Sequence, residues 1–101
     1  MHLVQILLPL VDDAGAPFPP EHYRVVGDLL TERFGGLTAY TRAPAEGRWK
    51  QGGDVARDEI VIFEVMAKTL ERGWWRDYRS VLERRFAQES IVIRAHTIET
   101  L

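Results

Sequence analysis

Two apolar runs, each followed by a segment with helical periodicity, divide the chain into two similar halves. The first run, His2–Leu10, is nearly continuous, which is typical of a central strand packed on both faces. The second run, Glu59–Ala67, occupies the corresponding place in the second half. In the segment after each run, apolar residues recur at the spacing of an amphipathic helix. The pattern therefore predicts two β-α-β units in one chain.

Capping residues suggest where the two predicted helices begin and end. Pro19-Pro20-Glu21 is expected to begin the first helix, because proline fits a first turn and an acidic residue there meets the positive end of the helix dipole. Gly35-Gly36 is expected to end it, since glycine adopts the left-handed cap conformation without steric cost. Thr69 is the predicted N-cap of the second helix. Trp74 is expected over a sheet edge, just off a stripe of core side chains: Trp75, Tyr78, Leu82 and Phe86.

Shorter segments complete each unit and predict the fold. Leu37–Arg42 and Ile91–His96 are the second and fourth predicted strands. Ala43–Val55, which is rich in glycine and polar residues, is expected to be a long loop between the second and third strands. The fold class predicted for residues 1–101, as a single domain, is an α+β ferredoxin-like βαββαβ sandwich. Its four-stranded antiparallel sheet has the order 4-1-3-2, with two helices on one face.

Side chains alternate along a strand, so each residue is assigned to the face that the helices cover or to the uncovered face. The covered set is uniformly apolar: Val4, Ile6, Leu8, Val61, Phe63, Val65, Ile91 and Ile93. The uncovered set mixes apolar and polar residues: Gln5, Leu7, Tyr40, Arg42, Ile62, Glu64, Met66, Val92, Arg94 and His96. Such a mixture is typical of a dimer interface or of a binding pocket. We expect a homodimer that packs its sheets face to face, with room for a small-molecule ligand between them.

The polar side chains of the uncovered face are the candidates for chemistry. Glu64 is a candidate general base, His96 a second acid-base group, and Tyr40 or Arg42 a group that holds an oxyanion. The simpler interpretation, which the sequence favours, is a cross-strand ion pair between Glu64 and Arg94 that sets the strand register or dimer specificity. The residues expected to contact a ligand are Arg42, Trp49, Glu64, Arg94 and His96.

Trp49 is the conspicuous residue of the predicted loop. A large indole between glycines either pins the loop to the domain or to a second copy, or closes over a ligand. Pinning is the favoured interpretation.

Composition and charge argue against several classes of function. The 101 residues suffice for one hydrophobic core, and their formal net charge of −2 argues against a nucleic-acid partner. Cysteine is absent, which excludes disulfides, thiolate catalysis and cysteine-ligated metals. The three histidines show no ligand spacing, so no metal is expected. The chain shows no phosphate loop, dinucleotide fingerprint or nucleophile elbow, so no cofactor is expected either.

The apolar start of the chain is too short to be a membrane span. It ends near Pro9, and no basic region precedes it as in a signal peptide. We therefore expect no membrane partner and a cytoplasmic bacterial protein.

Three short strings resemble a family of small uncharacterised bacterial proteins. They are Gly47-Arg48-Trp49, Asp54–Glu59 running into Ile60–Val65, and Arg85–Ile91. The family includes lipoproteins of unknown function, but this chain lacks their lipobox cysteine and leader. The resemblance implies a ferredoxin-like fold and brings no established activity.

Two functional hypotheses follow. The favoured one is a dimeric, non-catalytic module that binds a small molecule or a protein through the uncovered face and the Trp49 loop. The alternative is a small dimeric α/β-barrel-type enzyme that acts on a small organic molecule by acid-base chemistry. Its cavity would be lined by the polar groups named above: Tyr40, Arg42, Glu64, Arg94 and His96.

Overall fold

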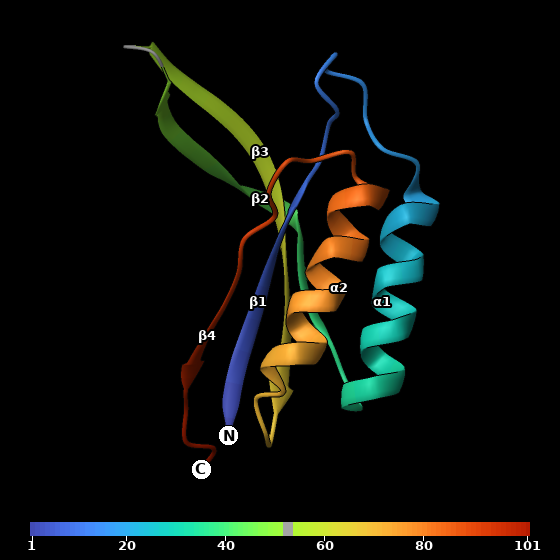
Figure 1. Ribbon diagram of the computed structural model, residues 1–101, viewed down its shortest axis with the longest axis vertical. Helices are drawn as coiled ribbons and strands as arrows, with labels where there is room; N and C mark the ends of the chain where they lie inside the picture. Colours follow the sequence, from blue (N-terminus) through green and yellow to red (C-terminus); the bar gives the residue numbers. More distant parts are fainter. Residues whose placement is uncertain (52–53) are drawn as a thin grey trace.

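The computed structural model describes residues 1–51 and 54–101, and the side chains of residues 1–40 and 60–101. The helices and strands of these residues are β1 (His2–Pro9), α1 (Pro20–Phe34), β2 (Thr38–Gln51), β3 (Asp54–Ala67), α2 (Arg72–Arg85) and β4 (Ile93–Thr97). The strands pair antiparallel in the order β2-β3-β1-β4, and both helices lie on one face of the sheet (Figure 1). The predicted ferredoxin-like sandwich is confirmed, including its strand order.

The core lies between the covered face of the sheet and the two helices. Seven of the eight residues assigned to the covered face are buried, and Ile93 near the free edge is partly buried. Helix α1 adds Val26 and Leu30 to this core, while α2 adds the predicted stripe from Trp75 to Phe86. Burial of each large apolar side chain contributes roughly 1.5–3 kcal/mol. Hydrophobic periodicity therefore accounts for the two-layer architecture.

The ends of the helices agree with the capping signals in one case and not in the other. Helix α1 ends at Phe34, and Gly35 follows with φ of 80° and an N–H that donates to the Thr31 carbonyl at 2.8 Å. Helix α2 begins only at Arg72, with Glu71 at the N-cap, so the prediction of Thr69 as N-cap was wrong. Leu70 packs against the core before the helix begins.

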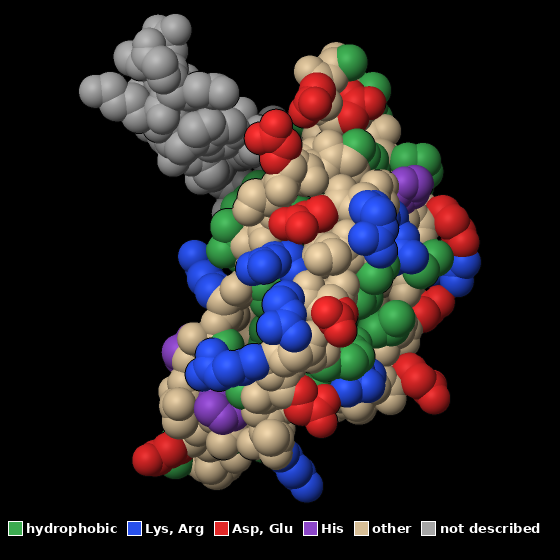
Figure 2. All heavy atoms as spheres, viewed as in Figure 1, with side chains coloured by type: hydrophobic (Ala, Val, Ile, Leu, Met, Phe, Trp, Pro, Cys, Tyr) green, Lys and Arg blue, Asp and Glu red, His purple; other side chains and the backbone are tan. Residues whose placement is uncertain are grey.

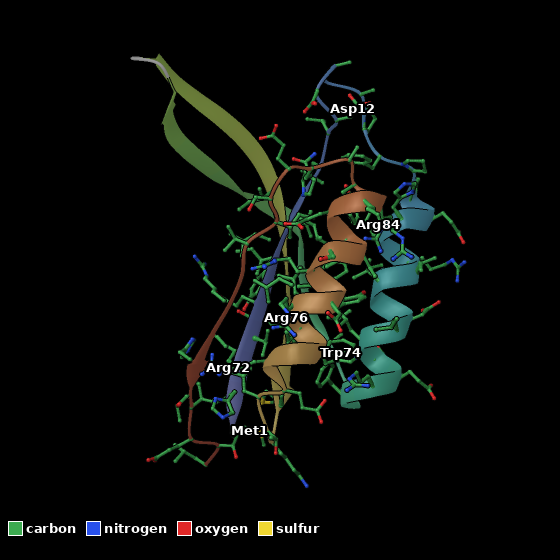
Figure 3. All side chains as sticks on the ribbon, in the orientation of Figure 1. Met1, Asp12, Arg72, Trp74, Arg76 and Arg84 are labelled. Carbon is green, nitrogen blue, oxygen red and sulfur yellow. The ribbon has the colours of Figure 1, made fainter. Side chains whose placement is uncertain are left out.

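Trp74 also differs from expectation, because it packs between the helices and not over a sheet edge. Its ring centroid lies 4.1 Å from the guanidinium carbon of Arg33 and 5.6 Å from the ring centroid of Phe34, both at the end of α1. Figure 3 shows Trp74 on the side of α2 that faces α1.

The segment predicted as a long loop is largely strand, so this prediction was wrong. Strand β2 continues to Gln51 and pairs with β3 from Ala45↔Ile60 to Gln51↔Asp54. The pairing shifts register between Tyr40 and Ala45, where Pro44 lies, and proline is tolerated in strands at such irregularities. Beyond this point the two strands form a ribbon that projects past the rest of the sheet (Figure 1). The side chains of Arg42 and Trp49 lie outside the described residues, so the roles predicted for them stay predictions.

Candidate ligand-binding face of the sheet

The uncovered face places polar residues from different strands side by side. Strand β1 pairs on one side with β3 and on the other with β4, which sets Gln5 opposite both Glu64 and Arg94. Tyr40 of β2 is opposite Ile62 of β3, and Ile62 is the next residue after Glu64 on the same face of that strand. The face is therefore centred on a row of polar side chains that crosses the whole sheet.

These side chains form a continuous chain of hydrogen bonds, which we call the polar chain: Arg94, Gln5, Glu64 and Tyr40. Arg94 Nε donates to Gln5 Oε1 at 2.7 Å, and Gln5 Nε2 donates to Glu64 Oε1 at 2.5 Å. The Tyr40 hydroxyl donates to Glu64 Oε2 at 3.1 Å. Both carboxylate oxygens and both ends of the Gln5 amide thus have partners within the subunit. Hydrogen bonds to a charged group are the stronger kind.

The direct ion pair expected between Glu64 and Arg94 is not what the structure contains. Strand β1 lies between their strands, and Gln5 relays the contact from the guanidinium to the carboxylate. Two strand spacings amount to roughly 9–10 Å, too far for a cross-strand pair of neighbours. The sequence assigned Gln5 to this face by alternation but did not identify it as a site residue. Its central position emerges only from the strand order combined with the register.

Glu64 also determines the ionisation of Tyr40. The pKa of Tyr40 is raised above its usual value, first because its hydroxyl donates to the Glu64 carboxylate, and further because the negative charge disfavours a phenolate. The phenol therefore stays protonated at neutral pH and serves as a donor. The hydroxyl that was predicted to hold an oxyanion thus already donates to Glu64.

His96 lies apart from the polar chain. It is an exposed residue opposite Leu3, two positions along β4 from Arg94, which pairs with Gln5. His2 is opposite Thr97, so strand alternation sends the side chains of His2 and His96 to opposite faces. Within the described part of the chain, no group of three His, Cys, Asp or Glu residues is placed to hold a metal ion. The structure brings Tyr40 and Glu64 together but leaves His96 outside their contact.

Apolar side chains lie on either side of the polar chain. The most accessible of them are Met66 at 53% and Val92 at 52% relative exposure, and the ring of Tyr40, within the polar chain, is 48% exposed. Leu3, Leu7 and Ile62 are half-buried on the same face. The helices shield the opposite face of the sheet, so these accessible apolar side chains are a feature of the uncovered face.

Solved structures of other proteins share this architecture. The PII-like protein CutA from Nostoc sp. PCC 7120 aligns with a TM-score of 0.65 and 17% identity, over 98% of this chain and 82% of that one. The divalent cation tolerance protein CutA1 from Thermus thermophilus aligns with a TM-score of 0.64 and 16% identity, over 99% of this chain and 86% of that one. A phage SAM lyase in complex with S-methyl-5′-thioadenosine aligns with a TM-score of 0.62 and 14% identity, over 94% of this chain and 79% of that one.

The likeness shows the fold. At these identities it does not extend to activity. No family model matches the chain, and no curated protein matches it. The resemblance to lipoproteins therefore finds no support. Among the described helices, none is long and apolar enough to span a membrane.

Proposed function

We propose that the protein is a homo-oligomeric, non-catalytic binding module whose contact surface is the uncovered face of the sheet. The observation that carries the proposal is the polar chain, whose four side chains are hydrogen-bonded to one another within the subunit and lie beside accessible apolar side chains. We keep the bacterial, cytoplasmic setting expected from the sequence as part of the proposal.

The polar chain favours burial against another surface. Burying a charge is costly unless it is paired and hydrogen-bonded. Arg94 and Glu64 carry opposite charges, and Gln5 connects them by one hydrogen bond at each end of its amide. A partner surface that covers this face therefore meets charges that are already linked by hydrogen bonds, which lowers the cost of burying them.

The projecting ribbon adds a second reason for self-association. Strand β1 ends opposite Ile60, so the ribbon formed by residues 45–51 and 54–59 has no third strand from β1 beside it. A two-stranded ribbon alone is marginally stable in water. Contact with another copy would support it, and the sequence expectation for the number of copies is two.

The enzyme hypothesis receives less support from the same residues. Tyr40 is held as a donor by Glu64, and both oxygens of Glu64 already accept hydrogen bonds from its own subunit. His96 lies outside this contact.

Native mass spectrometry and sedimentation velocity on the full chain test the assembly. Met66→Lys places a charge on the uncovered face, and Leu29→Lys, its matched control, places one on the outer side of α1, where the side chain is 40% exposed. We expect the wild type and Leu29→Lys to form the same oligomer, and Met66→Lys to shift toward monomer. A monomeric wild type, or an unchanged Met66→Lys oligomer, would refute the proposed interface.

A further inference from the structure

A groove with a strongly basic wall lies between α2 and β4, which we call the arginine groove. It has a volume of about 300 Å³ and is lined by four arginines, Arg72, Arg76, Arg79 and Arg94. Its floor is apolar and includes Val4, Trp75 and Ile93. Figure 2 shows Lys and Arg side chains gathered along this margin of the molecule. The first three arginines lie outside the polar chain, whereas Arg94 belongs to the polar chain and also lines the groove.

The arginines of α2 converge because of their spacing. Positions 72, 76 and 79 share one helix face, since residues three and four apart are neighbours on a helix. The Nη2 atom of Arg76 lies 3.7 Å from the position that a Cβ on Gly73 would occupy, so this guanidinium folds back over the first turn of the helix. Figure 3 places Arg72 and Arg76 on the side of α2 that faces β4.

Two acidic residues on either side of this wall in the sequence, Glu71 and Glu83, are engaged elsewhere. Glu71 accepts a hydrogen bond from Arg33 of α1 at 2.6 Å. Glu83 accepts one from the backbone N–H of Ile91 at 3.0 Å. Neither carboxylate therefore neutralises the arginine groove.

Only a weak ion pair reaches the groove within the described side chains. Arg76 Nε and Asp77 Oδ1 are 4.0 Å apart, with both side chains largely exposed, so the contact contributes little. Among residues 1–40 and 60–101, no carboxylate forms an ion pair with Arg72 or Arg79. The groove thus holds excess positive charge in a chain whose net charge is −2.

This arrangement works against the stability of α2. Arg72 is the first residue of the helix, and the first turn contains no acidic residue. A cation there opposes the helix dipole, and like charges four residues apart repel each other. A bound anion would relieve both effects, because it would face the positive helix end and the guanidinium groups together.

We propose that the arginine groove binds a small organic anion with a phosphate-type head group carrying at least two negative charges. The guanidinium forks of Arg72, Arg76 and Arg79 hold the head group, since their geometry matches phosphate oxygens in pairs. The apolar part of the ligand packs on the floor beside Trp75. The volume suits a small molecule, for which pockets span roughly 300–1,000 Å³. The net negative charge of the chain disfavours a long nucleic acid.

Isothermal titration calorimetry of the full chain at low salt tests this proposal with two probes, pyrophosphate and dimethylallyl diphosphate. We expect both to bind, and the ester to bind more tightly because it buries hydrocarbon on the floor. Arg72→Gln and Arg79→Gln are each expected to weaken pyrophosphate binding about tenfold.

Arg84→Gln is the matched control, because Arg84 is an exposed arginine on the same helix outside the groove, and Figure 3 shows it near the other end of α2. The affinity of the Arg84→Gln variant for pyrophosphate should stay within about twofold of that of the wild type. An equal loss in Arg84→Gln, or no binding of either probe to the wild type, would overturn the proposal. If an oligoribonucleotide displaced pyrophosphate at a concentration lower than that of pyrophosphate itself, the proposal would be overturned in favour of a nucleic-acid surface.

Thermal unfolding without ligand separates a binding role from a structural one. Arg72→Gln should leave the Tm unchanged or raise it, because it removes a cation from a helix N-terminus. Pyrophosphate should raise the Tm of the wild type and of Arg84→Gln, and raise that of Arg72→Gln much less. A lower Tm for ligand-free Arg72→Gln would assign the residue a structural role and contradict the proposal.

Discussion

Ile6 and Leu7 are neighbours in β1, yet they belong to faces of the sheet that differ in kind. Ile6 lies on the covered face and is fully buried among side chains from both helices. Leu7 lies on the uncovered face and is half-buried beside the polar chain. The covered face is apolar throughout, whereas the uncovered face pairs its polar groups laterally across four strands. The same alternation therefore produces a self-sufficient core on one side and, on the other, a surface suited to a partner.

The largest expected difference between the faces is in unfolding free energy. Ile6→Ala should lower the free energy of unfolding by about 2–5 kcal/mol, because it opens a cavity in a closed core. Leu7→Ala should lower the free energy of unfolding by less than Ile6→Ala does, and should instead weaken the oligomer. Urea denaturation measures the first effect, and sedimentation velocity the second. Equal losses in unfolding, with the oligomer unchanged, would erase the distinction between the faces.

Two tyrosines on the covered side sharpen the comparison, because only one of them has a hydrogen-bond partner. The Tyr23 hydroxyl donates to the Pro9 carbonyl at 2.5 Å, whereas the buried Tyr78 hydroxyl has no partner among the described residues. Tyr23→Phe should therefore lower the free energy of unfolding by about 1–2 kcal/mol, since a buried carbonyl loses its donor. Tyr78→Phe should leave it unchanged or raise it by about 1 kcal/mol. Urea denaturation of the pair checks the order, and a larger loss in Tyr78→Phe would contradict it.

The smallest expected effect concerns the polar chain. Glu64→Gln keeps the shape of the side chain but removes its charge, and should lower the free energy of unfolding by about 1 kcal/mol or less. The pKa of Tyr40 should fall toward the usual value of about 10, because the carboxylate that raises it is gone. Absorbance of tyrosinate against pH measures this change, and Tyr40→Phe identifies which transition belongs to Tyr40. An unchanged Tyr40 transition in Glu64→Gln would contradict the hydrogen bond described here.

The sequence predicted most of the fold because its signals are local. Hydrophobic alternation and helical spacing located the strands, the helices and the covered face, and glycine marked the end of α1. The strand content of residues 43–55 was missed. Glycine, proline and charged residues there have low strand propensity, so only pairing with β3 makes them strand.

The candidate sites were predicted less completely than the fold. Glu64, Arg94 and Tyr40 were assigned correctly to the uncovered face, but the role of Gln5 was not seen. The arginine groove was missed as well, although positions 72, 76 and 79 are visibly spaced on one helix face. From sequence alone such a stripe is typical of a solvated helix surface. It becomes the wall of a groove only because β4 lies beside it.

The sequence by itself determined where the two helices and the apolar parts of the strands lie, and which strand residues are buried, because these follow from the period of the apolar positions. Tertiary structure alone decided which polar groups meet. Gln5 contacts Glu64 and Arg94 across sequence separations of 59 and 89 residues, and the register of three strands sets both contacts. Such contacts leave no local periodicity in the chain, because each depends on how distant strands align with one another.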